Sequence, residues 1–408
     1  MTHAFADTLA DPAEYLPAAP QPRASTPLST PTSTTSAAPP ANLAEQIEHV
    51  AQYVATRGFV FDPWQIAAFI TAVRTKPFVI LAGISGTGKT KLPRLVAEAT
   101  GAKCITVPVR PDWTDSSDLI GFERLDGSFH PGELLRIARQ AQEHPEQQFF
   151  FVLDEMNIAR VEYYLAEVLS HLENRSPDSD GRVMSDPLAP QLIDSAANEW
   201  AQVRLPDNLC LVGSVNMDET TYGFSKKVLD RAFVIEFSQV DLSAVKPTNE
   251  QSAQSAQWES SHWKARALSL SSHPDCDTEA VASIIETLTE VNGILEQGQL
   301  QFGYRVRDEI TMFCLAAKDC ADLFATSDSG TVDPLDLAIA MKVLPRVQGG
   351  GATIRNILDG LHVWASPSSE EEAHGVPSGN DSQYPFCADR LELMLRRLQE
   401  TGFTNFWL

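Results

Sequence analysis

The sequence lacks the features that would place it among secreted, membrane or disulfide-rich proteins. Its six cysteines contain no C-x-x-C pair, which argues against a disulfide framework and a cysteine-based metal site. No apolar run approaches the roughly 18 residues that a membrane-spanning helix needs. The first residues have neither the basic start nor the apolar run of a secretory signal. These absences predict a cytoplasmic protein with reduced thiols and no membrane contact.

Basic residues are also scarce. The chain has 31 Lys and Arg against 54 Asp and Glu, a net charge of −23 and a pI near 4.7. Affinity for nucleic acid that is independent of sequence comes from neutralising phosphates with basic side chains. The composition therefore argues against a large nucleic-acid footprint and leaves only a weak or local contact open. An acidic surface also keeps a protein soluble.

The length of 408 residues exceeds one ordinary domain of roughly 150 residues, and the composition changes twice along the chain. Residues 1–41 are dominated by Pro, Ser, Thr and Ala, which predicts a disordered tail. Residues 42–245 begin with two helices and then alternate short apolar runs with helical stretches, which predicts an α/β domain around a parallel sheet. Residues 246–408 show helical periodicity and predict a separate, all-helical unit.

The predicted α/β domain has two further features. Gly121–His130 carries an Asp-Gly turn between short extended arms and predicts a β-hairpin. Asn174–Asn208 is rich in Pro, Asp and Ser and predicts an irregular insertion. The predicted strands are Phe78–Leu81, Cys104–Val109, Phe149–Leu153, Cys210–Val215 and Phe233–Phe237.

One motif matches the phosphate-loop pattern G-x-x-x-x-G-K-[ST] in full. It follows an apolar strand and precedes a helix-forming run, Lys91–Ala99, which is the context that the motif requires. The glycines let successive N–H groups point at phosphate oxygens, and the following helix adds its positive N-terminal dipole. Lys89 would neutralise the β- and γ-phosphates, and the Thr90 hydroxyl would bind Mg²⁺. The motif is Gly83, Ile84, Ser85, Gly86, Thr87, Gly88, Lys89 and Thr90.

Two adjacent carboxylates, Asp154 and Glu155, end the most apolar strand, Phe149–Leu153. Downstream of a phosphate loop, Asp154 would hold Mg²⁺ and Glu155 would polarise the water that attacks the γ-phosphate. An acid pair at this point would also suit the first turn of a helix, where acids are favoured.

Asn216 and Arg231 are further candidates. Asn216 ends the buried strand Cys210–Val215 and could hydrogen-bond the γ-phosphate and the attacking water, or could simply be a turn residue. Arg231 precedes the fifth strand and could reach a neighbouring subunit's nucleotide as an arginine finger. The alternative for Arg231 is an ion pair with Asp230 or Asp218.

The order of these elements resembles that of AAA+ ATPases, and local sequence narrows the resemblance to the McrB-like, dynein-related branch. It extends over residues 42–408. The tracts that carry it are Arg110–Gly121, Leu153–Tyr164, Asp218–Thr221, Phe224–Ala232 and Gly402–Trp407.

This resemblance implies an AAA+ P-loop core with a five-stranded parallel sheet in the order 5-1-4-3-2, and an all-helical C-terminal lid. It also implies ATP and Mg²⁺ as ligands, a ring that is usually hexameric, and hydrolysis at subunit interfaces. Arg305 would be sensor 2, with Arg307 as the alternative, and the Asp126–Gly127 hairpin would be a surface for a partner or substrate. Lys89, Arg231 and Arg305 are expected to converge on one triphosphate. By position, Gly83, Gly86, Gly88, Lys89 and Thr90 would bind phosphate and metal, Asp154 and Glu155 would be the Walker B pair, Asn216 sensor 1, and Arg231 the finger.

Two departures from the family shape the functional hypothesis. The branch's restriction member carries Met-Asn-Thr-Ala-Asp-Arg-Ser at sensor 1 and uses GTP, whereas residues 215–221 here differ, which favours ATP. That member also has a separate N-terminal DNA-reading domain, whereas this sequence predicts only a disordered tail there, which argues against methyl-DNA recognition.

The resulting hypothesis is an ATP-driven motor or switch that remodels or translocates a partner's substrate. Its effector would be a separate protein, such as the nuclease of a McrBC-like restriction system. The alternatives are a nucleotide-gated scaffold with little turnover, and a MoxR-like chaperone.

Overall fold

The computed structural model describes residues 42–189, 192, 199–217, 222–238, 254–327, 330–367 and 382–407. The predicted tail (1–41), the Asp218–Thr221 tract and the predicted domain boundary at residue 245 lie outside these residues. Within the described ranges, no helix is long and apolar enough to cross a membrane.

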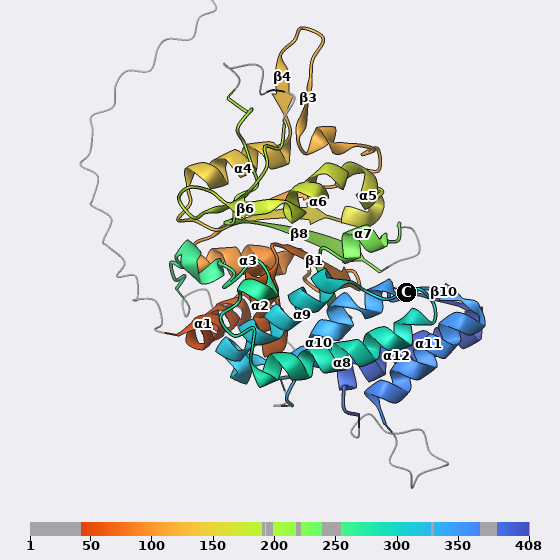
Figure 1. The fold of residues 1–408 in the computed structure, drawn as a ribbon. Helices are drawn as coiled ribbons and strands as arrows, with labels where there is room; N and C mark the ends of the chain where they lie inside the picture. The colour runs from red at the N-terminus through yellow and green to blue at the C-terminus, as the bar shows by residue number, and fades with distance from the viewer. Residues whose placement is uncertain are drawn as a thin grey trace, which may run out of the picture. The chain divides into compact units, whose positions relative to one another are not determined.

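A five-stranded parallel sheet forms the centre of the α/β part (Figure 1). From one edge to the other the strands stand in the order β2-β5-β8-β1-β9. Counted along the chain, this order is 5-1-4-3-2 when read from β9, as the resemblance implied. The strands are β1 (Phe78–Gly83), β2 (Lys103–Pro108), β5 (Phe149–Asp154), β8 (Leu209–Asn216) and β9 (Phe233–Phe237).

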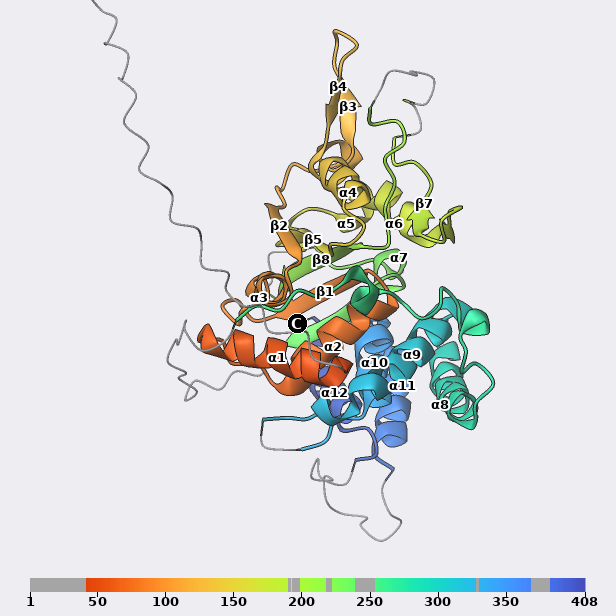
Figure 2. The same ribbon diagram turned by 90° about the vertical axis from the view of Figure 1, so that its left-hand side faces the viewer.

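Helices cover both faces of the sheet, which explains why its central strands are apolar throughout. Every residue of β1 is buried, and so are the first five residues of β5. Figures 1 and 2 show one group of helices on either side of the sheet. On one side lie α1 (Leu43–Thr56), α2 (Pro63–Thr75) and α3 (Lys91–Thr100), and on the other α4 (Glu133–Glu143), α5 (Val161–Tyr164) and α6 (Ala166–Glu173).

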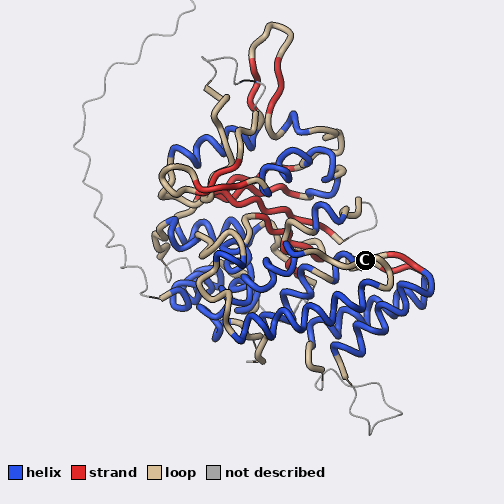
Figure 3. The backbone as a smooth tube through the Cα atoms, viewed as in Figure 1, coloured by secondary structure: helices blue, strands red, loops and turns tan. Residues whose placement is uncertain are grey.

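Two hairpins project from this domain. The predicted hairpin is confirmed as β3 (Gly121–Glu123) paired with β4 (Phe129–Pro131), and it extends beyond the helices (Figure 3). The expectation of a wholly irregular 174–208 stretch is wrong, because β6 (Arg175–Pro177) pairs with β7 (Val183–Ser185). The Asp178 carboxylate accepts the N–H groups of Asp180 (2.9 Å) and Arg182 (2.8 Å) and so builds the turn. The polar composition that suggested irregular structure therefore specifies a turn.

The C-terminal region is helical, as expected, with one small antiparallel pair between β10 (Gly349–Gly350) and β11 (Phe403–Thr404). The helix α9 begins at Tyr304. Its α-helical part ends at Ala317, before a 3₁₀ segment that Cys320 interrupts. The main helices are α8 (Glu279–Glu296), α9 (Tyr304–Ala317), α10 (Pro334–Lys342), α11 (Gly351–Ala365) and α12 (Pro385–Thr401).

A buried carboxylate joins α10 to α12. Asp336 accepts the N–H groups of Phe386 (2.7 Å) and Cys387 (2.9 Å), two donors that the first turn of α12 leaves without helical partners. Burial nevertheless raises the pKa of Asp336 to about 6. The folded state therefore binds this proton more tightly than the unfolded state does.

We expect this carboxyl group to make stability fall as pH rises. Its contribution is fully present below the ordinary Asp pKa and is lost as pH rises through about 6, an effect of up to about 3 kcal/mol. In urea unfolding from pH 4 to 6.5, the unfolding free energy of wild type should fall more than that of Asp336→Asn. Parallel pH profiles for the two proteins would contradict the raised pKa.

Candidate nucleotide-binding site

The phosphate loop lies between β1 and α3, and its glycines meet specific steric demands. A Cβ on Gly83 would stand 2.3 Å from the carbonyl oxygen of Phe237 on the neighbouring strand. Gly86 and Gly88 have φ values of 87° and 88°, in the left-handed region that favours glycine. The loop is exposed from Ile84 to Gly86, so its N–H groups are open to a ligand.

Lys89 is held inside this loop. Its side chain is buried, and its ammonium group donates a hydrogen bond to the carbonyl oxygen of Ile84 at 2.5 Å. Burial lowers the pKa of Lys89, while the carboxylates of Asp154 and Glu155 oppose that shift. The ammonium thus lies between the loop and the acid pair, where a phosphate would meet both.

Two side chains meet at one oxygen of Asp154. The Thr90 hydroxyl donates to Asp154 Oδ1 at 2.7 Å, and the Ser214 hydroxyl donates to the same oxygen at 2.6 Å. Ser214 also accepts the N–H of Glu155 at 3.0 Å. The structure therefore brings the predicted residues Thr90 and Asp154 together and adds Ser214.

Ser214 was missed in the sequence, although a signal for it was present. Side chains alternate between the two faces of a strand, so Ser214 lies on the same face of β8 as Asn216. In the sheet, Leu153 pairs with Gly213, which places Asp154 and Ser214 next to each other at the carboxyl ends of β5 and β8. The sequence signal for Ser214 was its position two residues before Asn216, the predicted sensor 1.

Glu155 and Asn216 form the second pair at this edge. The Asn216 amide donates to Glu155 Oε1 at 3.0 Å. Glu155 has φ 51° and ψ 48°, a left-handed conformation that costs a non-glycine residue on the order of 1 kcal/mol or more. The exposed carboxylate of Glu155 is thus held by Asn216 beside the mouth of the phosphate loop.

Arg231 and Arg305 lie elsewhere. Both guanidinium groups bind the same carboxylate oxygen of Glu173, at the end of α6. Phe233 pairs with Val79 at the amino end of the sheet, and Gly83 lies four residues further along β1, about 13 Å away at 3.3 Å per residue. Arg231 precedes Phe233, so it stands at the edge opposite the phosphate loop.

Arg231 and Arg305 are therefore separated from Lys89 within one chain, so the expected convergence of the three on one triphosphate would have to occur between subunits. All strands of a parallel sheet run in the same direction, from an amino edge to a carboxyl edge. The phosphate loop lies at the carboxyl edge, and the two arginines lie at the amino edge. The alternative sensor, Arg307, binds Asp308 at 2.6 Å and lies over the Tyr304 ring.

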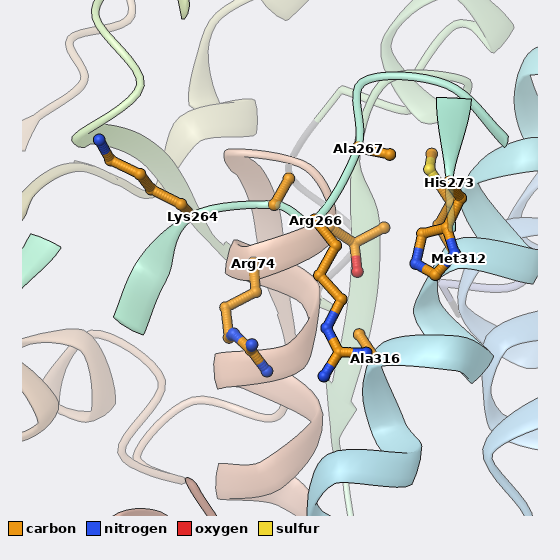
Figure 4. A pocket seen from close by; sticks show the side chains of 9 residues that line it. Arg74, Lys264, Arg266, Ala267, His273, Met312 and Ala316 are labelled. Atoms are coloured by element: carbon orange, nitrogen blue, oxygen red, sulfur yellow. The ribbon is translucent and has the colours of Figure 1, made fainter. Parts of the chain in front are cut away.

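The amino edge also contains a cavity of about 290 Å³ between the sheet and the helical region. Lys76, Arg175, Lys264 and Glu309 are among the residues that line it. Figure 4 shows the small hollow beside this cavity, with Arg74 on α2, Arg266 on the loop between the 3₁₀ segments Ser260–Trp263 and Leu270–Ser272, and Ala316 on α9. Arg74 and Arg266 both pair with Asp319, at 3.4 Å and 2.6 Å. Charged contacts therefore join the helical region to α2 at this edge.

Known proteins match this chain in two separate parts. Residues 78–233 match the AAA domain (dynein-related subfamily), and residues 256–403 match a domain of unknown function (DUF8727). The type IV methyl-directed restriction enzyme EcoKMcrB subunit of Escherichia coli K12 is 26% identical over 189 residues. That alignment covers 43% of this chain and 38% of the relative, so the chain matches about two fifths of the relative's length.

Among solved structures, a presumed ATPase from Cytophaga hutchinsonii aligns with a TM-score of 0.44 and 14% identity, over 74% of this chain and 87% of its own. The match to the AAA domain runs from the first residue of β1 to the first residue of β9, and so contains the phosphate loop, the acid pair and Asn216. Residues 78–233 are therefore similar to the dynein-related AAA domain, and part of the chain is similar to the McrB subunit.

Proposed function

We propose that this protein binds ATP with Mg²⁺ and hydrolyses it at the carboxyl edge of its sheet. The observation that carries the proposal is the set of contacts around the phosphate loop, with Thr90 and Ser214 on Asp154, and Asn216 on Glu155. Every group that phosphoryl transfer to water requires within one subunit is present at this edge.

The residues at the loop suit Mg²⁺. This ion prefers oxygen ligands and is usually bound through one or two carboxylates together with water and substrate phosphates. Thr90 Oγ1 and the Asp154 carboxylate supply that donor set, 2.7 Å apart. The described residues contain no group of three or more His, Cys, Asp and Glu that could hold a metal without a ligand's help. When bound, Mg²⁺ would neutralise charge on the phosphates.

Each side chain has a distinct role in the proposed reaction. Lys89 would exchange its bond to the Ile84 carbonyl for phosphate oxygens and neutralise their charge. Glu155 would accept a proton from the attacking water, and Asn216 would orient both that carboxylate and the water. The conformation of Glu155 at φ 51° supports this role, because backbone strain of this kind clusters at functional sites.

The two arginines would act across a subunit interface. Arg231 stands at the amino edge, about 13 Å or more from its own phosphate loop, so a catalytic role requires a neighbour's nucleotide. Arg305 shares Glu173 with Arg231 and would approach the same neighbouring nucleotide as sensor 2. This arrangement supports a ring of identical subunits, with a hexamer as the family's usual number.

ATP use would drive a separate partner. The matched relative is named as one subunit of a restriction enzyme, which supports a distinct effector protein here. The β3–β4 hairpin would contact a partner or substrate, since Leu125 at its tip is fully exposed and Phe122 is about half exposed. We retain remodelling or translocation of a partner's substrate as the output, and ATP as the nucleotide.

Glu155→Gln should bind ATP and hydrolyse it about 10² to 10⁴ times more slowly than wild type, because the general base is lost. Lys89→Ala should fail to bind ATP. Fluorescent-nucleotide binding and phosphate release measure the two effects, with exposed Glu167→Gln on α6 as the control. Wild-type turnover in Glu155→Gln would refute the assignment of the base.

Ser214→Ala should raise the Mg²⁺ concentration needed for half-maximal turnover about 10- to 100-fold, because Asp154 loses a hydrogen bond that orients it. A titration of ATP turnover with Mg²⁺ measures the change. Ser283→Ala, at an exposed position of α8, is the matched control. If both variants gave the wild-type Mg²⁺ dependence, Ser214 would have no part in holding the metal ligand.

A further inference from the structure

A buried lysine of the helical region holds the chain on both sides of Arg231. Lys342, the last residue of α10, has a fully buried side chain. Its ammonium donates to the carbonyl oxygen of Asp230 at 3.1 Å and to that of Ala232 at 3.0 Å. It also binds Glu309 Oε2 on α9 at 2.6 Å. An ammonium has three N–H donors, and these three contacts match that number.

The two carbonyls restrict the backbone at Arg231. They belong to the residues immediately before and after it, and both are fixed to one nitrogen atom. The direction in which the Arg231 side chain leaves the backbone is thus set by a residue of α10. Arg346, four residues beyond Lys342, adds a second contact, since its guanidinium lies 3.0 Å from the Asp230 carboxylate.

Glu309 also links Lys342 to the start of the sheet and lies on the helix face that carries Arg305. Glu309 lies one helical turn after Arg305 on α9, and residues four apart share a helix face. Glu309 Oε1 also binds Lys76, at 3.0 Å, two residues before β1 begins. One buried carboxylate therefore connects α9, α10 and the amino edge of the sheet.

We propose that Lys342 is a positioning residue that aims Arg231 at the neighbouring subunit's nucleotide. The helical region would thereby control the finger, because a movement of α10 against the sheet would displace both carbonyls that flank it. The proposal rests on the trans role of Arg231 described under the proposed function. The alternative is that Lys342 only fastens the helical region to the sheet.

Mixing variant subunits separates these two roles. A Lys342→Met subunit would keep its own phosphate loop and acid pair but would present a misplaced Arg231 to its neighbour. Its ATP turnover should be about 10²-fold below that of wild type, and its affinity for ATP should be unchanged. Glu155→Gln has the opposite defect. In equal mixtures about a quarter of the interfaces join an intact site to an intact finger, so turnover should return to about a quarter of wild type.

Three further variants secure the result. Arg231→Ala should show the same recovery with Glu155→Gln and serves as the reference for a lost finger. Lys318→Met, at an exposed position after α9, should match wild type. Lys342→Met combined with Glu309→Leu removes both members of the buried pair, which favours folding because apolar residues can replace such pairs. Lys76 would then face the cavity that it lines.

The outcomes are distinct. Recovery by Lys342→Met or the double variant supports the proposal. Wild-type turnover in Lys342→Met alone overturns it, and so does a mixture that stays inactive while the Arg231→Ala mixture recovers. If Arg231→Ala also fails to recover, the finger does not act in trans and the proposal falls with it. The assignment of the hydrolytic site would be refuted separately, by turnover in Glu155→Gln alone.

Discussion

The parallel register of the five strands is the constraint on which the rest of the structure depends. All five carboxyl ends meet at one edge, which gathers the phosphate loop after β1, the acid pair at the end of β5 and Asn216 at the end of β8. The same register sends Arg231, just before β9, to the other edge. The phosphate loop and acid pair, which would bind the nucleotide, thus lie at the opposite edge of the sheet from Arg231, which would stabilise the transition state of hydrolysis. Under the proposed mechanism, a single chain would be incomplete as a catalyst until a second copy supplied the other edge.

The amino edge is organised by charged contacts, buried at Glu309 and partly exposed at Glu173, rather than by apolar packing alone. Glu173 holds Arg231 and Arg305, and Glu309 holds Lys76 and Lys342. Such pairs cost desolvation energy and add little net stability, but their geometry is directional. They fix how the helical region meets the sheet. In a chain with a net charge of −23, these cations are concentrated where the proposed mechanism needs them.

The fold could be predicted where local chemistry determines it. Apolar runs in the sequence predict the five strands. A strand followed by a glycine-rich turn and a helix predicts the phosphate loop. The strand order followed from the family resemblance.

By contrast, Ser214 was missed because its role depends on the pairing of β5 with β8, which brings it to Asp154. The β6–β7 turn could not be predicted from a composition rich in Pro, Asp and Ser, because it depends on the hydrogen bonds that the Asp178 carboxylate accepts. Arg231 and Arg305 both bind Glu173, and Arg305 lies 132 positions from Glu173 in the sequence. Local sequence patterns cannot predict a contact between residues so far apart.

The central claim is that hydrolysis needs groups from two subunits, and the rate of ATP turnover per subunit over a wide range of protein concentration tests it most directly. Sedimentation at each concentration would report assembly. The account predicts turnover close to zero while the protein is a single chain, rising in step with assembly to a plateau. A turnover per subunit that is constant from single chains to the assembled protein would contradict it.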